Sequence, residues 1–96
     1  MSDLTLRELQ LILKEKDYKP ELKQAYFFKL IEEVGELAEV IRKDKRLNDQ
    51  DTIKGTIEEE LYDVLYYVIS LANVYGIDLE HCYNLKETIN KEKYNK

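Results

Sequence analysis

Residues 61–75, LYDVLYYVISLANVY, carry apolar or aromatic side chains in nearly every direction around a predicted helix. At about 100° per residue, they form one apolar stripe and a second face beside it. The stripe consists of Leu61, Val64, Val68, Leu71 and Tyr75, and the second face of Tyr62, Tyr66 and Ile69. A helix that is hydrophobic all round is buried all round, and a 96-residue chain can hardly bury it alone. We therefore expect partner subunits to cover the second face; the alternative is an aromatic-rich helix with some exposed tyrosines.

The rest of the sequence also indicates helices. Three glycines and one proline in 96 residues leave little to separate strands from one another. Two capping boxes, Thr5 with Glu8 and Thr56 with Glu59, predict the starts of a first and a third helix. Pro20 suits the first position of a helix and precedes a long second one, which we expect over about residues 26–43.

The third helix should end at Gly76, a residue favoured at helix C-termini, and Asp78 can cap a fourth helix over about residues 79–94. The polar stretch 43–55 is the longest expected loop. We predict an all-α, four-helix protein that forms a single domain over residues 1–96.

The composition excludes several classes of protein. Fifteen Lys and Arg against twenty Asp and Glu give a net charge of −5, which argues against a surface that binds nucleic-acid phosphates. The longest uncharged run, residues 64–77, is shorter than the roughly 18 apolar residues of a membrane span. The single cysteine, Cys82, cannot form an internal disulfide, and residues 1–10 lack a secretion-signal pattern. We expect a cytoplasmic protein with no nucleic-acid or membrane partner.

Asp63 is a charged residue inside the apolar third helix. Burying an isolated carboxylate costs several kcal/mol or more unless the group is paired or bound to a metal. Glu60 lies one turn before Asp63 and Tyr67 one turn after it, on the same flank of the apolar stripe. No Lys or Arg occurs between residues 56 and 84, so neither acid has a cationic partner on its own helix.

The second helix carries four acids beside its own apolar stripe, namely Glu32, Glu33, Glu36 and Glu39. Like charges three and four residues apart destabilise a helix by roughly 0.2–0.5 kcal/mol per pair. Gly35 adds a cost of about 1 kcal/mol relative to alanine. A helix that retains both destabilising features, the like charges and the glycine, is consistent with a binding site. The acids taken alone indicate a solvated face.

Facing stripes on the second and third helices would bring two acids from each helix together, provided that the helices pack antiparallel. The four residues are Glu33, Glu36, Glu60 and Asp63. Four carboxylates cannot stay ionised side by side without cations, and hard oxygen ligands of this type select Mg²⁺ or Mn²⁺. His81 stands alone and indicates a polar surface residue, and no Cys/His cluster suggests zinc.

These residues resemble a known family. Glu32-Glu33-x-x-Glu36, followed after a loop by Glu60-x-x-Asp63, is similar to the metal motif of the MazG-like all-α nucleotide pyrophosphohydrolases. The similarity extends over residues 30–41 and 58–79 and into Lys86-x-x-x-Asn90-x-x-Lys93-Tyr94, which together make up about half of the chain.

The resemblance implies a four-helix module that assembles as a homodimer or as a dimer of dimers, a homotetramer. It implies Mg²⁺, with Mn²⁺ as a substitute, held by Glu33, Glu36, Glu60 and Asp63. Glu32 would be a further ligand or would position the attacking water, so that Glu32, Glu33 and Glu36 are the implied catalytic residues. The implied reaction hydrolyses a nucleoside or deoxynucleoside triphosphate between its α- and β-phosphates, giving the monophosphate and pyrophosphate.

The family also places substrate-binding residues near the end of the fourth helix. The matching positions hold Lys86, Asn90, Lys93 and Tyr94, with Lys93 where arginine is frequent. Tyr67 matches a position near the nucleotide. A lysine-rich helix end is equally typical of a solvated terminus that interacts with the helix dipole. The chain has no Trp to stack on a base, so this role would fall to Tyr18, Tyr26 or Phe27.

Two alternatives remain at the level of sequence. One is an enzyme of the same superfamily that hydrolyses phosphoribosyl-ATP, although the acid spacing of such enzymes is less similar to Glu32-Glu33-x-x-Glu36. The other is a helical oligomerisation module without activity, in which Asp63 would pair with a Lys or Arg of another helix and no divalent metal would bind. Both enzymatic interpretations predict an acid cluster that lacks basic partners.

Overall fold

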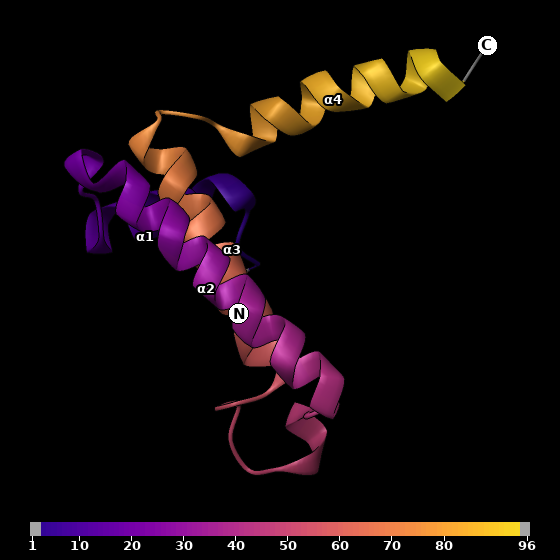
Figure 1. The fold of residues 1–96 in the computed structure, drawn as a ribbon. Helices are drawn as coiled ribbons and strands as arrows, with labels where there is room; N and C mark the ends of the chain where they lie inside the picture. The colour runs from indigo at the N-terminus through magenta and orange to yellow at the C-terminus, as the bar shows by residue number, and fades with distance from the viewer. Residues whose placement is uncertain (1–2, 95–96) are drawn as a thin grey trace.

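The computed structural model describes residues 3–94, and within this range the chain consists of helices, turns and loops with no strand (Figure 1). In chain order, the elements are α1 (Leu6–Lys16), the 3₁₀ helix η1 (Pro20–Leu22), α2 (Lys23–Lys43), the 3₁₀ helix η2 (Leu47–Asp49), α3 (Ile57–Val74) and α4 (Leu79–Tyr94). The predicted all-α architecture with four helices is confirmed. None of the described helices is long and apolar enough to cross a membrane.

Hydrogen bonds at the helix starts explain several of these bounds. The Thr5 hydroxyl accepts from the Glu8 N–H, and the Glu8 carboxylate accepts from the Thr5 N–H, which is the predicted capping box. The Thr56 hydroxyl likewise accepts from the N–H of Glu59, but the Glu59 carboxylate accepts from the N–H of Gly55 rather than of Thr56. The second capping box is therefore only half formed.

α2 and α3 form an antiparallel hairpin, which is the main packed unit of the chain (Figure 1). α2 begins at Lys23, earlier than the predicted residue 26, because η1 passes directly into it. Asp44 leaves α2 with a left-handed φ of 52°. An ion pair between Arg46 and Glu58 (3.0 Å) then holds the connection against the first turn of α3.

α1 packs against α3 and completes the core. Leu13 of α1 is 2% exposed and Ile69 of α3 is 0% exposed. Ile69 on the second face of α3 is thus buried within one chain, whereas Tyr62 on the same face is 44% exposed. The stripe is also partly open, with Leu61 53% and Tyr75 57% exposed. The covering of the second face by partner subunits stays a prediction.

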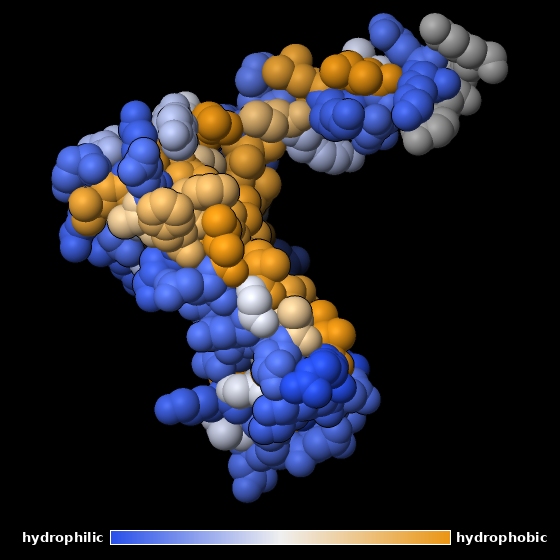
Figure 2. Space-filling view, viewed as in Figure 1, coloured by the Kyte–Doolittle hydropathy of each residue, from blue (hydrophilic) through white to orange (hydrophobic). Residues whose placement is uncertain are grey.

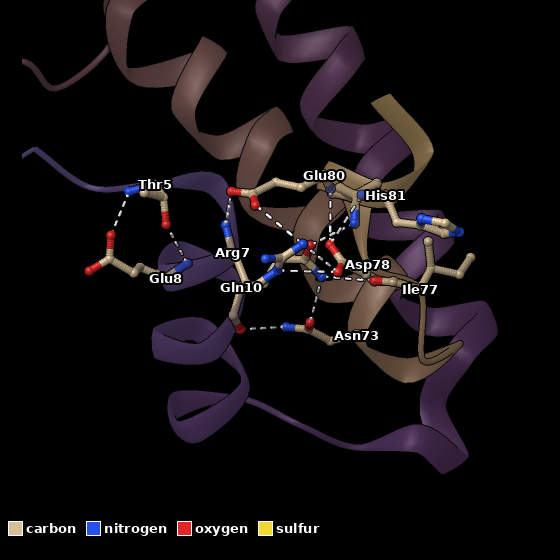
Figure 3. Close-up of polar contacts among 10 residues, drawn as sticks. Thr5, Arg7, Glu8, Gln10, Asn73, Ile77, Asp78, Glu80 and His81 are labelled. Atoms are coloured by element: carbon tan, nitrogen blue, oxygen red, sulfur yellow. Dashed lines mark hydrogen bonds and ion pairs between the residues drawn. The ribbon is translucent and has the colours of Figure 1, made fainter. Parts of the chain in front are cut away.

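A network of polar contacts fixes the turn between α3 and α4 on α1 (Figure 3). The Gln10 amide donates to the Asn73 side chain (3.1 Å) and to the Ile77 carbonyl (2.9 Å), and its oxygen accepts from the Leu79 N–H (2.9 Å). The Asn73 amide donates in return to the Gln10 carbonyl (2.9 Å). These buried groups are thereby satisfied, so the network sets where α4 begins.

α4 runs away from the body formed by the other helices and packs mainly against α1 (Figure 1). Asp78 precedes it and accepts from the Glu80 N–H, as the predicted cap requires, while the Arg7 guanidinium pairs with Asp78 at 2.8 Å. The four helices do not close into a bundle within one chain. The radius of gyration of 15.9 Å accordingly exceeds the value of about 12–13 Å for a compact domain of this length.

Apolar side chains gather on the outer face of the α2–α3 hairpin (Figure 2). The exposed ones on α2 include Phe27, Phe28, Ile31, Val34 and Ile41, and those on α3 include Leu61, Leu65 and Val68. An exposed apolar face of this extent is typical of a surface that contacts another protein chain.

Candidate active site

The antiparallel hairpin brings the predicted acids together on its inner side. Carboxylate oxygens of Glu33, Glu36 and Glu60 lie within 4.8 Å of one another, so each could offer one ligand atom to the same metal ion. A second group with the same spacing consists of Glu59, Glu60 and Asp63. Glu60 belongs to both groups and is buried. We call these five residues the acid cluster; it contains the four metal ligands that the sequence predicted.

Glu59 belongs to the acid cluster, but the sequence analysis did not include it among the candidate ligands. It had been assigned to the helix cap alone, and its carboxylate does accept from the N–H of Gly55 at 2.7 Å. A carboxylate has about four lone-pair sites, so one hydrogen bond leaves it able to bind a cation. Its position one helical turn before Asp63 could have identified it.

Burial and mutual repulsion oppose ionisation of these carboxylates. Burial raises the pKa of Glu33 to about 7, with further contributions from the neighbouring Glu60 and Glu36 carboxyls. Burial also raises the pKa of Glu60, and burial together with the charges of Glu59 and Glu36 raises that of Asp63. An arrangement of this type is relieved by a bound cation.

Two oxygens of the acid cluster, Oε2 of Glu33 and Oε2 of Glu60, are buried without a hydrogen-bond partner. Ion pairs occur elsewhere on the described surface, for example between Arg46 and Glu58, but among residues 3–94 none reaches Glu33, Glu36, Glu60 or Asp63. Leaving a buried polar atom unpaired costs about 1–3 kcal/mol, and more for a charged group. The cluster therefore suits a divalent cation with oxygen ligands.

The lack of ion pairs at these acids also tests the interpretation of the chain as an oligomerisation module without activity. That interpretation predicted a Lys or Arg beside Asp63, and the part of the chain that the structure describes contains no such ion pair. The absence of basic partners agrees with the two enzymatic interpretations.

Glu32 lies outside the acid cluster. Its side chain is 61% exposed and pairs with Lys29 at 3.3 Å, one turn earlier on α2. It is next to Glu33 in the chain but belongs to neither group of candidate ligands. Its predicted role as a ligand or as the residue that positions water stays a prediction.

Tyr67, one turn after Asp63 on α3, lines a cavity of about 180 Å³. Tyr67, predicted to lie near the nucleotide, lines this cavity together with Tyr26, Lys29 and Asp17. Burial raises the pKa of Tyr67, the charge of Lys29 opposes this shift, and the charges of Glu33 and Asp63 add to it. Of the three aromatic residues proposed to stack on a base, Tyr26 is at the cavity, whereas Tyr18 and Phe27 do not line it.

The predicted substrate residues of α4 are not brought to the acid cluster within one chain. Lys86 and Lys93 are exposed and Asn90 is half-buried, on a helix that extends away from the α2–α3 hairpin (Figure 1). The side chain of Tyr94 lies outside the described residues. Their predicted role in substrate binding stays a prediction.

Comparison with known proteins agrees with the all-α fold. The model of the MazG nucleotide pyrophosphohydrolase domain matches residues 22–94. Two crystal structures of iMazG from Vibrio DAT 722, Ntag-iMazG and Ctag-iMazG, are each 57% identical to the chain, with TM-scores of 0.87 and 0.84. The first covers 97% of this chain and 100% of its own, and the second 92% and 99%.

A curated relative is the uncharacterized protein YpjD of Bacillus subtilis (strain 168). It is 33% identical to this chain over an alignment that spans 88% of the chain and 81% of YpjD. The chain thus belongs to the MazG nucleotide pyrophosphohydrolase family. Within that family it is an enzyme, a nucleoside triphosphate pyrophosphohydrolase.

Proposed function

We propose that the protein catalyses the Mg²⁺-dependent hydrolysis of a nucleoside or deoxynucleoside triphosphate at the α–β phosphate bond. The products are the nucleoside monophosphate and pyrophosphate. The observation that carries the proposal is the pair of buried, unpartnered oxygens of Glu33 and Glu60 inside a cluster of five acids. A divalent cation would compensate those oxygens, and a cation at this place also explains how an acidic protein binds a polyanion.

The acids have two roles in the proposed site, metal binding and activation of water. Glu33, Glu36, Glu60 and Asp63 hold Mg²⁺, or Mn²⁺ in its place, and Glu59 is placed to assist. When bound, the metal neutralises the triphosphate, polarises the attacked phosphorus and lowers the pKa of water. Glu32, on the solvent side of Glu33, positions the attacking water and takes its proton. Phosphoryl transfer depends mainly on positioning and charge, so no covalent nucleophile is required.

The nucleotide extends from the acid cluster into the cavity beside Tyr67. We expect Lys86, Asn90, Lys93 and Tyr94 of α4 to bind its phosphates and sugar across a subunit interface, in a homodimer or homotetramer. The exposed apolar face of the α2–α3 hairpin and the projecting α4 support this assembly. A cytoplasmic location is consistent with such a substrate.

Pyrophosphate release from a panel of nucleoside triphosphates tests the proposal, with Mg²⁺ and with a chelator. We expect equal amounts of monophosphate and pyrophosphate, and no turnover in chelator. Release of orthophosphate alone would place the cleavage at another bond and contradict the proposal. Phosphoribosyl-ATP belongs in the panel, since hydrolysis of this compound alone would assign the chain to the related activity instead.

A further inference from the structure

Arg7 of α1 holds the start of α4 through both its backbone and its side chain (Figure 3). Its N–H donates to the Glu80 carboxylate (3.0 Å), and its guanidinium pairs with the same carboxylate at 3.3 Å. The guanidinium also donates to the Asp78 carboxylate from Nε (3.2 Å) and from Nη2 (2.8 Å). Because these donors belong to one rigid plane, they restrict the direction of the bound carboxylates as well as their distance.

The other contacts that direct α4 also lie at its base. Gln10, one turn after Arg7 on α1, accepts from the Leu79 N–H at 2.9 Å. Beyond the first turn of α4, residues 81–89 are all exposed, and a cavity of about 310 Å³ lies between α1 and the second turn. The direction in which α4 leaves its own chain therefore depends on a small group of polar contacts at its first turn.

The length of α4 amplifies any change at this base. A 16-residue helix is about 24 Å long, so a tilt of about 10° at its first turn moves its last turn by about 4 Å. The residues expected to bind substrate lie on the far half of this helix. A misplacement of about 1 Å can cost about 100-fold in rate when a group must meet a bound substrate.

We propose that Arg7 is a positioning residue for the reaction, which sets the direction of α4 and thereby the place of Asn90 and Lys93 at the nucleotide. Without the guanidinium, the like charges of Asp78 and Glu80 repel each other, and the first turn of α4 can tilt on the Gln10 contact. This role rests on the proposed function, because it takes α4 as the source of substrate-binding residues.

Arg7→Gln tests the proposal, since it removes the charge and the planar fork. The Arg7 side chain is 56% exposed, and exposed ion pairs contribute little to stability, so the variant should stay folded. We expect KM for the best triphosphate of the panel to rise at least about fivefold while kcat changes less than about twofold. Asp78→Asn keeps the helix cap but loses the ion pair, and should give the same result.

A double-mutant cycle shows whether Arg7 acts through α4. In the background of Lys93→Ala, Arg7→Gln should change KM by less than about twofold, because the group that it positions is gone. Arg42→Gln is the matched control, since Arg42 pairs with Glu39 of its own helix, and its KM should equal that of the wild type. An unchanged KM in Arg7→Gln, or full multiplication of its effect with that of Lys93→Ala, would overturn the role of Arg7.

The direction of α4 can also be measured without turnover. Spin labels on Lys16→Cys of α1 and Lys91→Cys of α4 report the distance between two exposed positions, with Cys82→Ser removing the single native cysteine. Dilution with unlabelled chains restricts the signal to distances within one chain. We expect one narrow distance distribution, which Arg7→Gln shifts or broadens. Identical distributions would overturn the role of Arg7, whereas a shift without hydrolysis of any triphosphate would overturn the proposed function alone.

Discussion

Burial and neighbouring negative charges both destabilise the ionised form of Asp63 in the acid cluster. Its carboxylate is half-buried, and the charges of Glu59 and Glu36 add to the burial that raises its pKa. Shifted pKa values of this kind are typical of functional sites. If Asp63 binds a metal ion, replacing its carboxylate by an amide should affect activity and stability in opposite directions.

We expect Asp63→Asn to lower the rate of pyrophosphate release by more than about 100-fold, because it removes a charged ligand that contributes several kcal/mol. In metal-free buffer the same variant should be as stable as the wild type or more stable, since one like charge is gone. Steady-state kinetics and thermal unfolding measure the two effects. Asp51→Asn, an exposed acid of the α2–α3 loop, is the matched control and should change neither. Wild-type turnover in Asp63→Asn would remove this residue from the mechanism.

Glu33 makes the stability of the metal-free protein depend on pH. Its pKa is 4.5 as a free side chain and about 7 in the folded chain, so the folded state holds the proton more tightly. The stabilisation is full below pH 4.5 and is lost as the pH rises through about 7. In chelator, the melting temperature should therefore fall between about pH 5 and pH 8, and Mg²⁺ should oppose the fall.

Glu33→Gln provides the control for this pH dependence. The amide does not titrate, so the melting temperature of the variant in chelator should change much less over the same range. A wild-type melting temperature that rises with pH would contradict the raised pKa. Acids with lowered pKa, such as Asp17, act in the opposite sense but at more acidic pH.

At the scale of the elements, the cap of α3 supports the helix that carries three of the five acids. Thr56 is fully buried, and its hydroxyl accepts from the N–H of Glu59 at 3.1 Å. Thr56→Ala should lower the free energy of unfolding by about 1 kcal/mol, because it leaves this N–H without an acceptor. Thr56→Ser retains the hydroxyl and should recover most of the loss. Urea unfolding followed by circular dichroism measures both, and equal stability of the three proteins would contradict the cap.

The helix ends were predictable because their causes are local. Thr5 with Glu8, and Gly76 after α3, act through neighbours a few residues away, and the structure agrees with both. The direction of α4 was not predictable, because it depends on contacts between residues far apart in the sequence, such as Gln10 with Asn73. Arg7 went unnoticed for the same reason, since its partners lie at the start of α4.

The grouping of the acids could be predicted from the sequence because their spacing follows the helical repeat. Glu60 and Asp63 share one flank of α3, and antiparallel packing against α2 was enough to place them with Glu33 and Glu36. How far a single chain covers each face of α3 could not be predicted. Both faces are apolar, and their burial depends on where α1 packs, which the periodicity of α3 does not show.

The shape of the whole molecule supports the proposal that the protein works as a homodimer or homotetramer. A projecting α4 and an exposed apolar face on the α2–α3 hairpin leave surfaces that water solvates poorly. We expect sedimentation at neutral pH to give a mass of two or four times 11.5 kDa. A mass of 11.5 kDa at concentrations that support hydrolysis would contradict the assembly.

Val34→Lys tests whether this assembly uses the apolar face of α2. Val34 is 49% exposed in the middle of that face, so a lysine there is tolerated in the monomer but places a charge inside a dimer interface. We expect the variant to dissociate and to lose activity in parallel, because the proposed site takes substrate-binding residues from α4 of a partner. Ile53→Lys, at 45% exposure in the α2–α3 loop, is the matched control and should stay assembled and active. A monomeric Val34→Lys with full activity would show that each chain binds its nucleotide without α4 of another.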